Sequence, residues 1–148
     1  MRSFVIIAAL LCLSGCSLLG IHILQDSLTA AQHSDLGYTY EKQNKLELAE
    51  KEYLKALKKD KALAVPCFNL GNVYYKMGKP DQAVKYYRLG LKKASDQSDQ
   101  SDIMNNLAFV LMEQGNYAEA HKWVEKAIAI APKPEYLDTR EKILNRLK

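Results

Sequence analysis

The feature that most constrains this chain is a sequence pattern that occurs three times. The segments HSDLGYTYEKQNKLELAEKEYLKAL, CFNLGNVYYKMGKPDQAVKYYRLGL and MNNLAFVLMEQGNYAEAHKWVEKAI align without gaps. Gly37 and Gly71 are 34 positions apart, and Ala108 follows 37 positions later. A fixed period of about 20–50 residues indicates a repeat protein, in which each unit buries its apolar face against its neighbours.

Within each unit, small and large apolar residues alternate in the way that two packed helices require. The small residues let the two helices approach closely, and the large ones fill the space between helices and between units. Turn signals separate the two halves, with Gly78 and Gly115 at permissive positions and Pro80 suited to a first helical turn. The small residues are Gly37, Gly71 and Ala108, then Ala49, Ala83 and Ala120; the large ones are Tyr40, Tyr74 and Leu111, then Tyr53, Tyr87 and Val124.

This period and these positions resemble the tetratricopeptide repeat (TPR) family, over roughly residues 30–134. The resemblance implies an all-α fold, an α-solenoid of three TPR helix-turn-helix repeats with a C-terminal capping helix. The expected units are residues 30–63, 64–97 and 101–134, with the capping helix at 135–148. The spacing between the second and third units is longer because SDQSDQSD occupies residues 95–102. We expect this insertion to lengthen a loop and to leave the helices unchanged.

The first residues have the pattern of a signal peptide. Met1 and Arg2 give a short positive segment, and an apolar run follows from Phe4 to Leu13. The tetrapeptide Leu13-Ser14-Gly15-Cys16 resembles the bacterial lipobox. The resemblance implies a lipoprotein signal peptide at residues 1–15, cleavage before Cys16, lipidation of that cysteine, and a tether over residues 16–29.

The expected location follows from the same motif. Ser17 comes after the cysteine, and a residue other than Asp there resembles the default outer-membrane pattern of enteric-type bacteria. The sequence therefore favours a lipid-anchored protein of the bacterial cell envelope, on the outer membrane and facing the periplasm. One alternative stays open, because the apolar stretch from Phe4 to Leu24 is about long enough to span a bilayer without cleavage.

Charge and cysteine usage argue against several other functions. The formal net charge is only +4, and lysine and glutamate alternate instead of forming a basic block, so no nucleic-acid partner is expected. Cys12, Cys16 and Cys67 are far apart and include no CxxC pair, so neither a zinc site nor a redox dithiol is expected. Cys67 occupies a packing position of the second repeat and is interpreted as a buried free thiol.

Nothing in the sequence indicates catalysis. The three histidines, at positions 22, 33 and 121, form no HxxxH arrangement and have no acidic residues at ligand spacing, so we expect surface or packing roles for them. No GxSxG elbow, P-loop or GxGxxG motif is present. We therefore expect no enzymatic activity, cofactor, metal or small-molecule substrate.

The TPR resemblance also indicates where a partner binds, because the first helix of each repeat lines the concave face. Aromatic and methionine side chains beside amides suit a peptide or helix of another protein. Two equivalent asparagines resemble the start of a ladder that grips an extended backbone. The predicted partner-binding residues are Tyr38, Glu41, Phe68, Asn69, Asn72, Tyr75, Asn105, Asn106, Phe109 and Met112.

A carboxylate clamp of the chaperone-binding kind is not expected, because its basic positions hold Ser34, Asp102 and Asn106. The sequence thus predicts a membrane-anchored interaction module or assembly factor of the envelope that binds a partner segment in its groove. Two alternatives remain: the asparagines are merely solvated while Phe68 and Phe109 pack internally, or copies of the chain associate with one another as structural subunits.

Overall fold

The computed structural model describes residues 26–148, and this part of the chain folds into α-helices with no strand. The predicted signal peptide, Cys16 and the tether up to residue 25 lie outside the described residues. No helix between residues 26 and 148 combines the length and the apolar character needed to cross a bilayer. The helices are α2 (Ala30–Lys42), α3 (Leu46–Lys59), α4 (Val65–Lys76), α5 (Pro80–Leu91), α6 (Gln97–Glu113), α7 (Tyr117–Ile130) and α8 (Pro134–Leu147).

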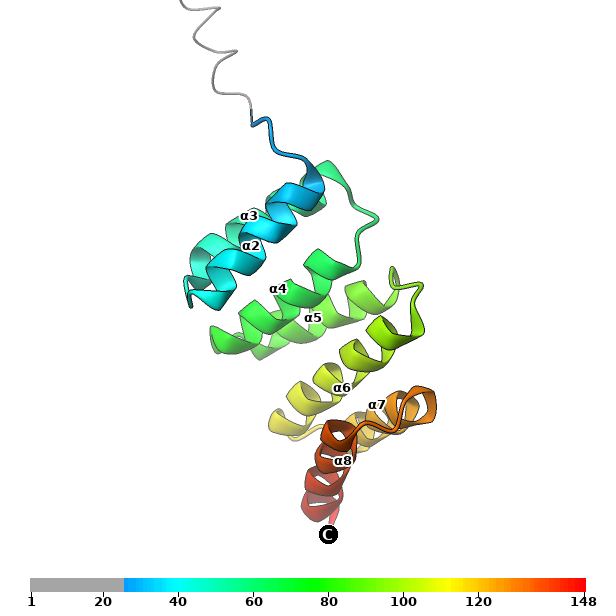
Figure 1. Cartoon of the computed structure of the whole chain (residues 1–148). Helices are drawn as coiled ribbons and strands as arrows, with labels where there is room; N and C mark the ends of the chain where they lie inside the picture. Colours follow the sequence, from blue (N-terminus) through cyan, green and yellow to red (C-terminus); the bar gives the residue numbers. More distant parts are fainter. Residues whose placement is uncertain (1–25) are drawn as a thin grey trace, which may run out of the picture.

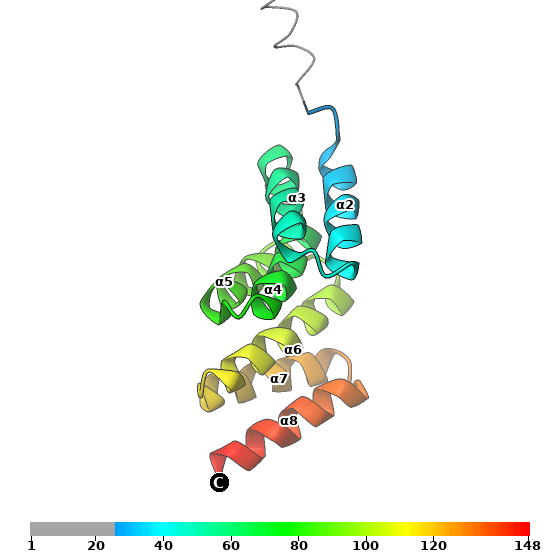
Figure 2. The same ribbon diagram turned by 90° about the vertical axis from the view of Figure 1, so that its left-hand side faces the viewer.

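The helices pack as three consecutive pairs. α2 packs on α3, α4 on α5 and α6 on α7, and each pair contacts the next through α3 with α4 and α5 with α6. Figures 1 and 2 show the pairs following one another along the molecule, from the α2–α3 end to α8, which covers α7. The predicted all-α solenoid of three helix-turn-helix repeats with a C-terminal helix is confirmed.

The turn inside each repeat requires one residue with a positive φ. Gly78 has φ +70° and Gly115 has φ +79°, the left-handed region that glycine adopts without a steric penalty. The first repeat has Asn44 at this place with φ 57°, and asparagine is among the residues that tolerate that conformation best. These turns return the chain so that the two helices of a repeat run antiparallel.

Close helix contact explains the small residues of the pattern. A Cβ atom placed on Gly71 would lie 2.3 Å from the Tyr87 ring, and one on Gly37 would lie 2.7 Å from the Tyr53 ring. Ala49, Ala83 and Ala120 are fully buried, at 0% exposure each. The register of the repeats inferred from the sequence therefore matches the packing.

The expectation for the SDQ insertion is wrong. α6 begins at Gln97 and spans 17 residues, against 12 in α4, whereas the linkers before these two helices, residues 92–96 and 60–64, are equally long, so the insertion lengthens the helix and not the loop. Asp96 caps this longer helix, because its side chain accepts hydrogen bonds from the backbone N–H groups of Ser98 and Asp99.

The added turn of α6 packs against the last helix. Ser101 is fully buried and its hydroxyl lies 3.1 Å from that of Tyr136 on α8. Tyr136 also donates a hydrogen bond to Asp102, and Lys133 contacts the same carboxylate at 2.6 Å. The insertion therefore supplies part of the contact that holds α8 on the third repeat.

Candidate partner-binding groove

A cavity of about 410 Å³ opens between α2, α4 and α6, the first helices of the three repeats. One residue of a second helix, Tyr87 of α5, also reaches it. The lining is mainly amide and aromatic, with one acid and one base. It consists of Glu41, Asn72, Tyr75, Lys76, Tyr87, Asn105, Asn106, Phe109 and Val110.

Three of these side chains form a hydrogen-bonded row. The Tyr87 hydroxyl donates to Asn72 Oδ1 at 2.8 Å, and Asn106 Nδ2 donates to the same oxygen at 3.1 Å. Desolvation raises the pKa of Tyr87, so its hydroxyl stays a donor. The row orients both amides. Among residues 26–148, Asn72 Nδ2 and Asn106 Oδ1 have no hydrogen-bond partner, so one donor and one acceptor are left for a ligand.

Asn105 adds a third amide side chain to the lining of the cavity. The residue is only 8% exposed, and its Oδ1 atom is buried without a hydrogen-bond partner. Within the described part of the chain, no other buried side-chain nitrogen or oxygen lacks a hydrogen-bond partner. A buried acceptor left unpaired costs about 1–3 kcal/mol, so this atom lowers the stability of the folded chain.

An ion pair closes the α2 side of the cavity. Lys76 Nζ lies 2.7 Å from Glu41 Oε1, and the Tyr53 hydroxyl donates to Glu41 Oε2 at 3.0 Å. Desolvation and the nearby Glu41 carboxylate raise the pKa of Tyr53. The two charges that line the cavity therefore neutralise each other, and its remaining polar groups are uncharged.

Two aromatic rings form its apolar part. Tyr75 and Phe109 meet edge to face, with ring centroids 5.7 Å apart and planes at 84°. Tyr75 remains 38% exposed, so its ring offers apolar surface beside the amides. Tyrosine is among the residues that contribute most to binding energy at protein interfaces.

The structure brings together six of the ten residues predicted from the sequence: Glu41, Asn72, Tyr75, Asn105, Asn106 and Phe109. The other four lie elsewhere. Tyr38 is exposed on α2, Phe68 packs near the Tyr87 ring with centroids 6.1 Å apart, and Met112 is buried in the core. Asn69 lies beside the Tyr53 hydroxyl and not at the cavity.

Sequence reasoning missed three lining residues: Lys76, Tyr87 and Val110. Tyr87 occupies a position that the repeat pattern assigns to the core, and its ring is indeed buried there. Only its hydroxyl passes between the helices to the amide row. A tyrosine at a position where phenylalanine would pack equally well is the one signal that could have indicated this role.

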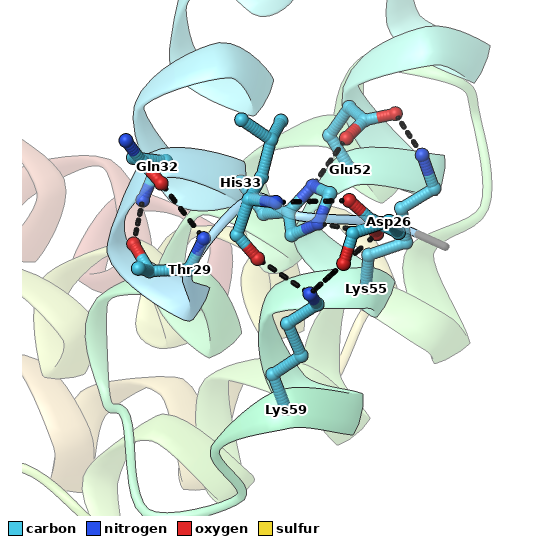
Figure 3. Close-up of polar contacts among 8 residues, drawn as sticks. Asp26, Thr29, Gln32, His33, Glu52, Lys55 and Lys59 are labelled. Carbon is cyan, nitrogen blue, oxygen red and sulfur yellow. Dashed lines mark hydrogen bonds and ion pairs between the residues drawn. The ribbon is translucent and has the colours of Figure 1, made fainter. Parts of the chain in front are cut away.

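A second polar cluster, unexpected from the sequence, lies where the described chain begins (Figure 3). His33 of α2 is fully buried, with Nδ1 2.6 Å from Glu52 Oε2 and Nε2 2.7 Å from Asp26 Oδ2. His33 therefore has a packing role, as expected, and its two ring nitrogens link three segments of the chain: residue Asp26, α2 and α3.

Two lysines complete this cluster. Lys59 of α3 donates to the backbone carbonyls of Asp26 and Leu28, and Lys55 pairs with Glu52 at 2.8 Å. Desolvation raises the pKa of Asp26, but hydrogen bonds from the Leu28 N–H and from His33 outweigh it and lower that pKa overall. Residues 26–29, which the sequence assigns to the tether, are thus fixed to the first repeat.

Family comparisons agree with the fold and its period. The sequence matches the family described as "Tetratricopeptide repeat" over residues 63–133 and the family described as "TPR repeat" over residues 37–78. Residues 37–133 therefore form a tetratricopeptide repeat domain. No curated protein matches the chain significantly.

Several solved structures share this architecture. The first TPR domain of Spaghetti (RPAP3), bound to the HSP90 peptide SRMEEVD, has a TM-score of 0.75 and 23% identity, covering 82% of this chain and 95% of that one. The N-terminal domain of STI-1 from C. elegans has a TM-score of 0.71 and 21% identity, covering 80% and 94%. Pseudomonas aeruginosa PilF has a TM-score of 0.74 and 22% identity, covering 82% of this chain and 55% of PilF. At these identities the likeness concerns the fold.

Proposed function

We propose that this chain is a lipid-anchored TPR protein of the bacterial cell envelope that binds a segment of a partner protein in the cavity between α2, α4 and α6. It acts as an interaction module or assembly factor, held at the outer membrane through Cys16 and facing the periplasm. The observation that carries the proposal is the incomplete hydrogen bonding of the cavity lining, in which Asn72 Nδ2, Asn106 Oδ1 and the buried Asn105 Oδ1 have no partner among residues 26–148.

The cavity suits a protein segment better than a small metabolite. It is open, and it places uncharged amides beside the exposed ring of Tyr75. Such a surface can bind the backbone of an extended segment through the amides and an apolar side chain through the ring. The structural neighbour RPAP3 binds a peptide segment, which supports the same mode of binding here.

The anchor is supported by the motif and by the way the chain meets the first repeat. Leu13-Ser14-Gly15-Cys16 follows an apolar run of the expected length. Lys59 and His33 fix residues 26–29 to the first repeat, so only nine residues separate Cys16 from the folded part. Fully extended, nine residues span about 30 Å, which would keep the groove close to the membrane surface.

Lipidation is tested by metabolic labelling with palmitate. We expect label on the parent chain and none on Cys16→Ala, which should also accumulate as uncleaved precursor. Cys12→Ala is the matched control, because it removes a cysteine from the same apolar run but leaves the tetrapeptide intact. Equal labelling of Cys16→Ala and the parent chain would show that the proposed anchor is wrong.

Partner binding is tested by site-specific photocrosslinking in envelope fractions. A photoreactive residue at Tyr75 samples the cavity, and one at Lys85, exposed on α5, samples a surface that does not line it. We expect a defined protein adduct from position 75 and none from position 85. An adduct from position 85 alone would place the partner elsewhere, and an adduct with the mass of two copies would favour the self-associating alternative.

A further inference from the structure

A second cavity, of about 420 Å³, opens between α5, α6 and α7 and shares no lining residue with the groove between α2, α4 and α6. Its lining combines three apolar side chains with two cations and one amide: Leu91, Met104 and Trp123, then Arg88, Lys92 and Gln100. We propose that this cavity is a second partner-binding site, which takes a large apolar side chain flanked by carboxylates on an acidic segment of a partner protein. This inference goes beyond the proposed function, because it concerns a different surface and a different chemistry.

The apolar part of this cavity reflects a difference between the second and third repeats. Tyr86 of the second repeat corresponds to Trp123 of the third in the gap-free alignment. The Tyr86 ring stacks on the Tyr74 ring of the same repeat, with centroids 5.2 Å apart. The counterpart of Tyr74 in the third repeat is Leu111, which has no ring. Trp123 instead lines the cavity and stays partly exposed.

The first helix of each of these repeats shows a similar difference. Cys67 on α4 is fully buried, whereas its counterpart Met104 on α6 is partly exposed and lines the cavity. Methionine adapts its shape to a bound group, and tryptophan is among the residues that contribute most to binding energy at interfaces. The cavity therefore offers the kind of apolar surface that holds a partner side chain.

The surroundings of this apolar surface are positively charged. Arg88 pairs with Glu119 at 2.6 Å, and Trp123 Nε1 donates to the same carboxylate at 3.1 Å. Lys126 Nζ lies 4.4 Å from the centre of the Trp123 ring. Neither Lys92 nor Lys126 forms an ion pair with an acidic side chain among residues 26–148. Three cations thus accompany one carboxylate, and acidic residues of a partner would balance the excess.

The size of the cavity favours a protein segment over a lipid. The acyl chains of a bilayer lipid are about 15 Å long, half of the hydrocarbon core, so they would extend beyond the cavity into water. The side chain of one leucine or phenylalanine is smaller than the cavity. Neighbouring residues of the same segment can then bring carboxylates to Lys92 and Lys126, in the manner of an apolar anchor surrounded by a polar rim.

The test uses the fluorescence of Trp123, the only tryptophan of the chain, which reports directly on this cavity. The full chain is reconstituted in phosphatidylcholine nanodiscs and titrated with the peptide acetyl-Glu-Glu-Leu-Glu-Glu-amide. Three matched peptides each change one feature: glutamine replaces glutamate, lysine replaces glutamate, or glycine replaces leucine. Nanodiscs that contain phosphatidylglycerol, without any peptide, test an anionic lipid as the occupant.

We expect the glutamate–leucine peptide to change the Trp123 emission in a saturable way, and the other three peptides to bind at least threefold more weakly. Lys92→Glu should weaken binding of the glutamate–leucine peptide at least threefold and strengthen binding of the lysine peptide. Lys58→Glu is the matched control, because Lys58 is exposed and occupies the same repeat position 34 residues earlier. It should bind the peptides as the parent chain does.

Three results overturn the inference. The first is no saturable response to the glutamate–leucine peptide in a folded chain, or an equal response to the glycine peptide. The second is an equal effect of Lys92→Glu and Lys58→Glu. The third is a change of Trp123 emission caused by phosphatidylglycerol alone, which would assign the cavity to a lipid. None of them depends on photocrosslinking at Tyr75, so this site and the groove can fail independently.

Discussion

Two buried polar clusters of this solenoid, around His33 and around Asn105, differ in how completely they are hydrogen-bonded. His33 is fully buried, and both of its ring nitrogens contact carboxylates at 2.6 and 2.7 Å. Asn105 is nearly as buried, yet its Oδ1 atom has no partner within residues 26–148. A satisfied network stabilises one arrangement of the chain, whereas an unsatisfied one lowers stability until a ligand completes it.

The two clusters also lie in different parts of the fold, as their different hydrogen bonding suggests. The His33 cluster joins residues 26–29 to α2 and α3 at the end of the solenoid where the described chain begins. The Asn105 cluster lies in the cavity between α2, α4 and α6. We therefore interpret the first as a device that holds the N-terminal segment and the second as the binding surface, and each interpretation makes a different prediction.

The largest change in the free energy of unfolding is expected from disrupting the hydrogen-bonded His33 cluster. His33→Leu removes the imidazole and leaves the Glu52 carboxylate, only 9% exposed in its side chain, without its nearest buried partner. Leaving a buried charged group without such a partner costs about 3–5 kcal/mol. Urea unfolding followed by circular dichroism should show this loss in the free energy of unfolding.

A matched histidine provides the control for that experiment. His121 lies on α7 and is partly exposed, with a 3.4 Å contact to Glu125. His121→Leu should change the free energy of unfolding by no more than about 0.5 kcal/mol. If His33→Leu is equally mild, the cluster does not stabilise the fold, and the contrast with Asn105 disappears.

The second prediction is an increase in the free energy of unfolding. Asn105→Leu replaces the unpaired amide with an apolar side chain of similar shape, so it should raise the free energy of unfolding by about 1–3 kcal/mol. The same change should weaken binding of the crosslinked partner. A stabilised chain with unchanged affinity would separate the unpaired acceptor from function, and a destabilised chain would show that the acceptor is satisfied in solution.

The third prediction concerns a smaller satisfied cluster, between α6 and α8. Tyr136→Phe removes the hydroxyl that contacts Ser101 and Asp102 but keeps the buried ring. We expect a loss of about 0.5–1.5 kcal/mol, the usual net contribution of a hydrogen bond. Thermal unfolding should show a lower midpoint than in Tyr117→Phe, whose ring on α7 is only partly buried. Equal midpoints would mean that the added turn of α6 contributes no polar contact to α8.

Much of the fold could be predicted because the sizes of the residues in the repeat pattern follow from how closely the helices pack. Gly71 and Ala83 are small since another helix lies against them, so their spacing indicates the helix pairs without any tertiary information. The insertion was misassigned for the opposite reason. Serine and aspartate are common in turns, whereas here Asp96 caps the helix and Ser101 and Asp102 bind Tyr136 on α8.

The site was less predictable because its hydrogen bonds join different repeats. The pattern indicates which face of α4 and α6 carries Asn72, Asn105 and Asn106, but not that Asn72 Oδ1 accepts two donors while Asn105 Oδ1 accepts none. The His33 cluster was missed because Asp26 approaches it through a non-helical segment. The repeat pattern does not indicate how such a segment packs against the helices.

The smallest change in stability is expected from lowering the pH. Hydrogen bonds from the Leu28 N–H and from His33 outweigh desolvation and lower the pKa of Asp26, and those from Lys55 and His33 do the same for Glu52. A carboxyl group whose pKa is lower in the folded chain stabilises it above the unfolded pKa, and this contribution is lost as the pH falls through the folded value. The ordinary values are 3.8 and 4.5, so the loss should occur below about pH 4.5.

Asp26→Asn tests this directly, because it keeps the shape of the side chain and removes its titration. The variant should unfold more easily than the parent chain at pH 6, and the difference should shrink as the pH is lowered to 3, because the parent chain then loses the charge that the variant lacks. The exposed Asp138→Asn on α8 is the control, since Asp138 forms its ion pair with Lys142 one turn away on the same helix. Urea midpoints measured across this range give both curves. If the Asp26→Asn curve stays parallel to that of the parent chain, the carboxylate does not hold residues 26–29 in place. Their attachment to the first repeat then depends on Lys59 and the backbone carbonyls that it binds.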